Sequence, residues 1–301
     1  MNPAIAVLVY ALAAQAATDA RQSRGTQTDQ TVQVSRGMRL AVDNYAGEVV
    51  IRTWEKDAVR VQARHATRTR ISIRTDANAV GVSGLSTSGR SESIDYDITA
   101  PPWMAIKIEG QFNYVSVDGV QGEVSIETVR GDIILKNAVS VTAKTIEGEI
   151  QVDGARGKLN LSSVNEGIKV MGASGDVTAE TTNGSISLSR IESSSVEVTT
   201  VNGDVAYEGA LADRGRYSFT THNGDIVLTV ADTANATFNV RTYSGDFGTS
   251  LSLKGPAATE VRRGKRVAYT LGTGSAEVAV ESFGGEIKLR RAGAARTGRN
   301  Q

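Results

Sequence analysis

Several residue types are scarce in this chain. Its 301 residues include no cysteine, 2 histidines, 4 prolines and only 5% aromatic side chains. The lack of cysteine excludes disulfides, thiolate catalysis and Cys-based zinc sites. So few aromatic residues cannot fill a bulky globular core. Because no proline lies between Trp103 and Lys254, this stretch can form uninterrupted β-ladders.

Net charge and several common motifs are also missing. The formal net charge is +0, which argues against a nucleic acid partner, because phosphate binding usually needs a concentrated basic excess. The sequence contains no Gly-x-Gly-x-x-Gly motif, P-loop, Gly-x-Ser-x-Gly motif or calcium-binding nonapeptide, so no cofactor is expected. No apolar run reaches the ~20 residues that a transmembrane helix needs.

What the chain has instead is one phrase that keeps returning. It follows the pattern Thr-x-x-Gly-Asp-Ile with small variations, and a weaker copy ends at Ile287. Its glycines are 17 to 21 residues apart, except for a double interval of 36 between Gly148 and Gly184. These glycines are Gly131, Gly148, Gly184, Gly203, Gly224 and Gly245. Self-similarity at a nearly fixed period indicates an architecture that stacks one unit.

Apolar residues alternate after each corner, as in Ile133 and Leu135, and this pattern predicts short strands with one buried face. A second, looser corner lies within the intervals, for example around Gly157. The Asn-Gly turns could also join hairpins in an antiparallel meander. Such a meander would exceed the roughly ten strands that open sheets usually reach. We therefore predict an all-β fold, a single-chain β-solenoid (β-helix) with coils of 17 to 21 residues.

The chain divides into five segments. Residues 1–16 are expected to be a signal peptide, because Ala4–Ala14 is apolar and Ala14-Gln15-Ala16 matches a small-x-small cleavage site; a short tail is the alternative. Residues 17–30 are polar and predict a flexible spacer. Degenerate β repeats follow over 31–105, with a Gly/Ser-rich interruption at Ala79–Ser93, and regular repeats over 106–289, interrupted at Lys254–Lys265. Residues 290–301 are expected to be a disordered basic tail.

Two features together carry a resemblance to a known family. Tyr96-Asp97-Ile98-Thr99-Ala100-Pro101-Pro102, then Ile106-Lys107-Ile108, precede the repeated Thr-x-x-Gly-Asp-Ile units. This arrangement resembles the toast-rack (DUF4097) family of bacterial adhesin-like β-strand repeat proteins, and the likeness covers residues 31–290. It implies an exported, right-handed β-solenoid with roles at the cell surface or in envelope stress. It supplies no catalytic residue to carry over.

The repeated acidic residue has two interpretations. Asp132, Asp204, Asp225 and Asp246 follow the turn glycine in register. Carboxylates stacked about 5 Å apart could share protons, bind Ca²⁺ or flank a glycosidic bond, as in a β-helical polysaccharide lyase or hydrolase. Alternatively, each Asp hydrogen-bonds its own turn, where the glycine supplies positive φ. We favour this structural role, so no catalytic or metal-binding residue is expected.

Basic residues concentrate in one stretch: Arg52, Lys56, Arg60, Arg64, Arg68, Arg70 and Arg74. They are either the solvent-facing positions of strands or a contact for acidic glycans or lipid head groups. His222 falls at a variable position of the phrase, which favours a stacked corner residue over a ligand. Trp54, Trp103, Tyr243 and Phe283 are either edge packing or platforms for sugars. The candidate interaction surface comprises Arg60, Arg64, Arg68, Arg70, Asn202, Asn223, Asp204, Asp225 and Asp246.

These observations predict a non-catalytic, exported β-solenoid in the periplasm or outside the cell. It would act as an envelope-associated, adhesin-like binding scaffold linked to envelope stress signalling, with an envelope protein or cell-surface glycan as its partner. Two alternatives stay open. One is the carboxylate-ladder enzyme described above, and the other is a structural module that adds strands to a partner through an uncapped solenoid end. The oligomeric state is left open.

Overall fold

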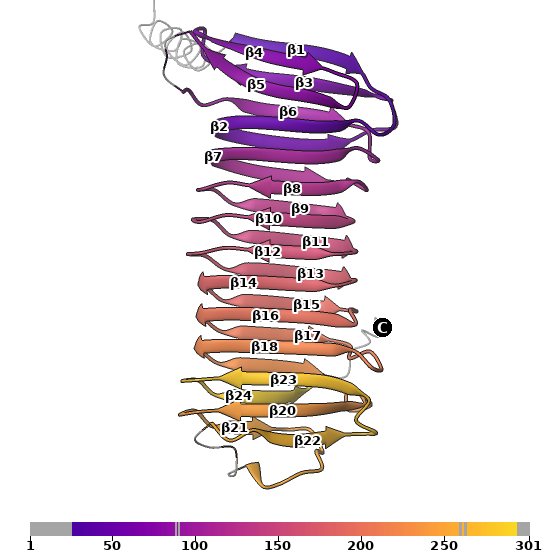
Figure 1. Ribbon diagram of the computed structural model, residues 1–301, viewed down its shortest axis with the longest axis vertical. Coiled ribbons are helices and arrows are strands. Elements are labelled where there is room, and N and C mark those ends of the chain that lie inside the picture. Colours follow the sequence, from indigo (N-terminus) through magenta and orange to yellow (C-terminus); the bar gives the residue numbers. More distant parts are fainter. Residues whose placement is uncertain (1–25, 88, 90, 259–260, 262–263, 294–301) are drawn as a thin grey trace, which may run out of the picture.

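The structure of the protein is a computed structural model that describes residues 26–87, 89, 91–258, 261 and 264–293. The predicted signal peptide, and residues 294–301 of the predicted tail, lie outside the described residues. The described chain forms one long rod of stacked strands (Figure 1) and contains no α-helix. The predicted all-β solenoid is confirmed, with two faces of mainly parallel strands.

Each central coil contributes one strand to each face. Strands of the first face end at the Thr-x-x-Gly corner, on the left-hand edge in Figure 1, and strands of the second face end at the opposite edge. The first face contains β8 (Glu123–Glu127), β10 (Ser140–Lys144), β12 (Leu159–Ser162), β14 (Val177–Asn183), β16 (Ser195–Asn202) and β18 (Arg216–Asn223). The second contains β9 (Ile133–Ala138), β11 (Ile150–Arg156), β13 (Ile168–Ser174), β15 (Ile186–Ile191), β17 (Val205–Gly209) and β19 (Ile226–Val230).

The core is the narrow space between the two faces. Side chains alternate along each strand, so Val124 and Ile126 point inward from β8 while Ile133 and Leu135 point inward from β9, and all four are buried. Parallel register puts Ile133 beside Ile150, which continues the same apolar column coil after coil. Removal of these aliphatic side chains from water is the main stabilising contribution to the rod.

The N-terminal end is closed by antiparallel strands. The long strands β2 (Arg39–Thr53) and β7 (Ala105–Asp118) pair along most of their length. Beyond them, β6 (Asp95–Ala100), β3 (Ala58–His65) and β1 (Thr26–Gln33) extend one face. The other face is extended by β5 (Ala79–Ser86) and β4 (Thr69–Thr75). Both antiparallel groups depart from the parallel order of the central coils.

At the C-terminal end the coils do not follow the order of the sequence. β23 (Ala276–Ser282) lies between β18 and β20 (Ala236–Thr242), and β24 (Ile287–Arg291) lies between β19 and β21 (Phe247–Thr249) (Figure 1). The chain therefore makes coil 236–249 first and then returns to fill the space between it and coil 216–230. β22 (Val267–Leu271) pairs antiparallel with β20 and covers the outer end.

Three local features differ from those expected. β1 begins at Thr26, inside the predicted spacer, because an edge strand held by pairing with β3 needs no alternating apolar residues. Most of the Gly/Ser-rich interruption forms β5. The double interval contains an ordinary coil, whose corner is Ser163-Val164-Asn165-Glu166-Gly167; one inserted residue and a Ser in place of Thr hid this copy of the phrase.

Candidate binding surface

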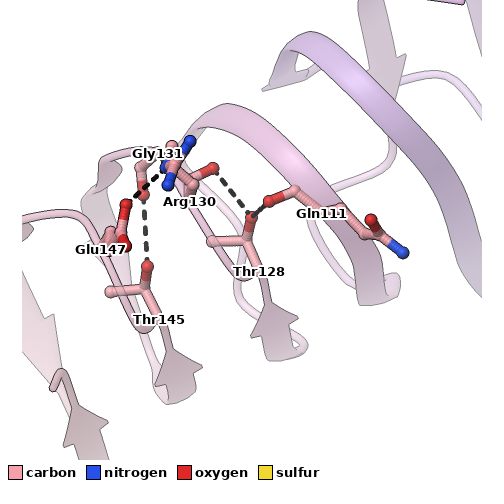
Figure 2. Close-up of polar contacts among 6 residues, drawn as sticks. All are labelled: Gln111, Thr128, Arg130, Gly131, Thr145 and Glu147. Carbon is pink, nitrogen blue, oxygen red and sulfur yellow. Dashed lines mark hydrogen bonds and ion pairs between the residues drawn. The ribbon is translucent and has the colours of Figure 1, made fainter.

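The threonine of the phrase holds neighbouring coils together. Thr145 is buried, and its hydroxyl donates a hydrogen bond to the carbonyl oxygen of Gly131 in the preceding coil at 3.5 Å, while Thr128 donates to Gln111 at 3.3 Å (Figure 2). The same bond recurs at 2.9–3.2 Å from Ser163, Thr181, Thr200, Thr221 and Ser282. The hydroxyl column therefore supplies a hydrogen-bond donor to one backbone carbonyl group of the preceding coil at each of these corners. From the sequence alone, this threonine was expected only to favour the strand conformation.

The phrase glycine has a different role from the one expected. The structure gives positive φ to Gly131 but not to Gly203 or Gly224. A Cβ on Gly203 would lie 2.0 Å from the carbonyl oxygen of Gly184, and one on Gly224 would lie 2.1 Å from that of Gly203. The glycines are required because successive corners stack backbone against backbone, so the predicted need for positive φ is wrong for most copies.

The phrase aspartate does not brace its own turn. Asp204 Oδ1 accepts a hydrogen bond at 2.9 Å from the backbone N–H of Asp225, and Asp225 Oδ1 accepts one at 2.8 Å from the N–H of Glu286. Asp132 does the same for Glu149 at 2.9 Å. Each carboxylate therefore joins its corner to the next coil, which corrects the expected partner while keeping the structural role.

The two variable positions of the phrase face solvent. Asn165, Asn183, Asn202 and Asn223 form an exposed ladder in which the amide nitrogens of the last three each donate to the amide oxygen of the preceding asparagine, at 2.8–3.1 Å. Beside the ladder, exposed apolar side chains occupy the other position: Val129, Ile146, Val164, Val201 and Phe283. We call these nine residues the corner surface. It runs along one edge of the rod.

Aromatic side chains continue this edge at its C-terminal end. The ring of His222 stacks on Phe283 with centroids 4.6 Å apart, and Phe283 contacts Tyr243 at 4.9 Å. His222 is thus a stacked corner residue, one of the two interpretations that the sequence allowed. Phe283 reaches this position only because its coil is inserted out of order, which sequence spacing alone did not indicate.

The structure brings some predicted surface residues together and separates others. Asn202 and Asn223 are hydrogen-bonded neighbours, and Asp204 lies beside Asp225 through the pairing of β17 with β19. Asp246 lies one coil further away, because Glu286 of the inserted coil intervenes.

The basic stretch is divided between the two faces. Arg52 forms hydrogen bonds to both carboxylate oxygens of Asp97 at 2.8 Å, Arg60 pairs with Asp29, and Arg64 lies 3.8 Å from Asp95. These arginines belong to the face that contains β3 and β6. Arg70 and Arg74 lie on β4, which extends the other face. The seven basic residues therefore do not form one cationic patch.

Ion pairs also link coils on the second face. Lys169 Nζ lies 2.5 Å from Glu149 Oε1, in the neighbouring coil. Partial burial acts to raise the pKa of Glu149, but hydrogen bonds from Lys169 and Gln151 outweigh it and hold the pKa below its ordinary value of 4.5. This carboxylate is therefore charged at neutral pH and contributes to coil stacking.

Two properties of the described residues bear on possible functions. Among the residues that the structure describes between 26 and 293, no three His, Cys, Asp or Glu side chains are grouped so that they could hold a metal ion. In the same part of the chain, no helix has the length and apolarity needed to cross a membrane.

Stacked coils, buried hydroxyl columns and an exposed repeated edge define a β-solenoid repeat protein with an extended lateral surface. The chain belongs to the toast-rack family: the family model described as Toastrack DUF4097 matches residues 38–290. None of the curated proteins matches the chain.

Solved structures of low sequence identity are also similar. A candidate cell adhesion protein from Clostridium sporogenes is 9% identical, with 89% of this chain and 100% of that chain covered and a TM-score of 0.27. A candidate adhesin from Parabacteroides distasonis is 7% identical, with 89% and 98% covered and a TM-score of 0.38.

Proposed function

We propose that the protein is a non-catalytic binding scaffold of the cell envelope, whose corner surface contacts an envelope protein or a cell-surface glycan. The observation that carries this proposal is that the repeated phrase has structural positions and exposed positions. Its Thr, Gly and Asp positions hold coils together, while its variable positions are exposed and repeat once per coil. Weak contacts repeated along one edge add up to strong attachment to a repeating partner.

The carboxylate ladder supports this proposal over the carbohydrate-active enzyme. Asp132, Asp204 and Asp225 each accept a hydrogen bond from the backbone of the next coil. These carboxylates therefore have a structural reason to recur at every corner. Incubation with acidic polysaccharides tests this point. New reducing or unsaturated ends that disappear in Asp225→Asn, which keeps the Oδ1 acceptor but removes the charge, would contradict a non-catalytic role.

Capture by isolated cell envelopes tests the binding role. The triple variant Asn183→Ala, Asn202→Ala, Asn223→Ala removes the centre of the amide ladder and should lower the retained fraction severalfold. A matched triple variant on the first face, Thr142→Ala, Asn160→Ala, Thr178→Ala, alters three stacked solvent-facing side chains and should bind like the wild type. Equal retention of both variants would contradict the assignment of binding to the corner surface.

Export is part of the same proposal. The small-x-small sequence Ala14-Gln15-Ala16 favours cleavage and a mature start near Ala17. Cell fractionation followed by N-terminal sequencing should find the shortened chain in the periplasm or medium. A cytoplasmic chain that retains Met1 would contradict export.

The proposal also links the protein to envelope stress signalling, as the family resemblance implied. A gene for a membrane anti-sigma factor or a stress-response kinase beside this one would support that link. Unchanged stress-reporter output in a deletion strain would contradict it.

A further inference from the structure

The edge opposite the corner surface is concave. A groove with a volume of ≈ 950 Å³ lies there, where β9, β11, β13 and β15 end (right-hand edge in Figure 1). Its lining runs from Gly119 to Glu192 and comes from successive coils. The proposed corner surface takes no residue from this groove, so it requires a separate explanation.

The floor of the groove is a column of residues in the left-handed backbone region. Gly154 and Gly172 are neighbours in adjacent coils, with φ of 73° and 71°. The next residues along the chain, Ala155 and Ala173, are buried, so the chain turns inward and leaves the floor recessed. Because glycine has no side chain, a ligand can approach the backbone closely at these positions.

The walls of the groove carry a particular kind of side chain. Apart from Ser174, their polar members end in flat groups that present adjacent hydrogen-bond donors or acceptors. These residues are Gln121, Asn137, Asp153, Arg156, Arg190 and Glu192. Two arginines and two carboxylates cancel in formal charge. No aromatic residue is among the described residues of the lining.

We propose that this groove binds an uncharged, hydroxyl-rich linear chain, a neutral oligosaccharide that lies along the rod axis. The inference rests on the proposed role of the rod as a non-catalytic binding scaffold. Flat groups with paired donors and acceptors match neighbouring hydroxyls of a sugar. The balanced charge gives an anionic polymer no net attraction, and the lining offers no aromatic anchor to a lipid or an apolar peptide. Coils about 4.8 Å apart repeat the contact along the chain.

Arg190 is the residue that most clearly departs from the repeat. Its φ is 53°, at a column position where neighbouring coils have Gly172 and Gly154. Left-handed backbone is unfavourable for a residue with a Cβ, so the fold alone does not favour arginine here. Its guanidinium lies 3.8 Å from Asp153, two coils away, and thus extends along the groove.

Calorimetric titration of the purified protein tests the inference with cellohexaose, maltohexaose, N-acetylchitohexaose and hexagalacturonic acid. At least one neutral hexasaccharide should bind saturably, and more tightly than the acidic one. Arg190→Gly removes part of the wall while relieving the backbone, and should weaken binding at least tenfold. The double variant Gly154→Asn, Gly172→Asn fills the floor with a residue that the column already accepts at Asn137, whose φ is 51°, and should weaken binding similarly.

Gly37→Asn is the matched control, because Gly37 also has positive φ, has open space around its Cβ and lies outside the groove. It should bind like the wild type. Preference for hexagalacturonic acid, no binding of any neutral hexasaccharide, or full binding by Arg190→Gly would overturn the inference. If envelope capture persists while no oligosaccharide binds, the groove inference fails alone. If isolated cell envelopes also fail to retain the wild-type protein and all of its variants, the proposed function fails as well.

Discussion

The two edges of the rod reverse the chain direction with different backbone structures. Both must turn the chain from one face to the other in every coil. At the corner surface, backbone stacks directly on backbone, and Thr hydroxyls donate hydrogen bonds to carbonyl groups of the preceding coil. At the groove, the chain turns through left-handed residues such as Gly172 and recedes from solvent. The first edge exposes a ladder of amides beside apolar side chains and the second forms a groove with charged walls, so one rod carries two surfaces of different chemistry.

The comparison also shows where sequence freedom lies. The Gly and Thr positions of the corner are fixed by close contacts with the preceding coil, whereas the variable positions between them are exposed. At the groove edge the constraint is a backbone angle, which Gly154, Asn137 and Arg190 all adopt. Functional specialisation can therefore arise at the exposed corner positions and along the groove without loss of the coil.

The largest expected difference between the edges concerns glycine. Gly203→Ala puts a Cβ 2.0 Å from a backbone oxygen that cannot move independently, and should lower the free energy of unfolding by on the order of 3 kcal/mol. Gly172→Ala meets no atom closer than 3.9 Å and bears only the cost of its positive φ, about 1 kcal/mol. Urea unfolding measures both variants. Equal losses would contradict the close-stacking role of the corner glycine.

The next largest effect concerns the hydroxyl column. Thr200→Val keeps the shape but leaves the carbonyl group of Gly184 without the hydroxyl donor, which should cost about 1–2 kcal/mol of unfolding free energy. Thr200→Ser keeps the hydroxyl and serves as the control, since Ser163 and Ser282 already occupy equivalent positions. If valine is as stable as serine in thermal unfolding, the hydroxyl column has no stabilising role.

A smaller effect of opposite sign is expected at the groove. Arg190→Gly removes a side chain with an unfavourable backbone angle and should raise the free energy of unfolding, by about 0.5–1 kcal/mol. The paired control is Asn137→Gly, where the gain should be smaller because Asn tolerates this region well. Loss of stability in Arg190→Gly would show that the arginine serves the fold.

The smallest expected effect concerns pH. The pKa of Glu149 lies below its ordinary value of 4.5, so its contribution is complete above that pH and is lost as the pH falls through the folded-state pKa. Lys169→Gln removes the main partner and should lessen the acid dependence of Tm by an amount equivalent to a few tenths of a kcal/mol. Identical profiles for the variant and the wild type as the pH falls below 4.5 would contradict the assignment.

Much of this fold could be predicted from the sequence, because alternation and period are local properties. The strands around Ile133 and Leu135 followed from alternation, and the solenoid followed from the spacing of glycines. The order of the last coils could not be predicted in this way. Coils 236–249 and 276–291 carry the same phrase, so either one matches the exposed end of the coil before it. Only the three-dimensional packing distinguishes the two orders.

The candidate site was harder to predict, because its contacts join different coils. Asn202 and Asn223 were surface candidates from their positions in the repeat, but spacing alone could not show that their amides form one ladder. Arg60 and Arg70 are close in the sequence and were therefore grouped together, although the turn between β3 and β4 puts them on different faces. The groove could not be predicted from the sequence, because its floor consists of small residues and its walls come from separate coils.

The central claim is that the exposed corner positions contact the partner while the structural positions only build the rod. Covalent footprinting of the protein bound to isolated cell envelopes tests it most directly. Binding should protect Val201, Asn202, Asn223 and Phe283 from labelling, while Thr142 and Thr178 on the first face remain as reactive as in the free protein. Protection of the first face with an unprotected corner surface would contradict it.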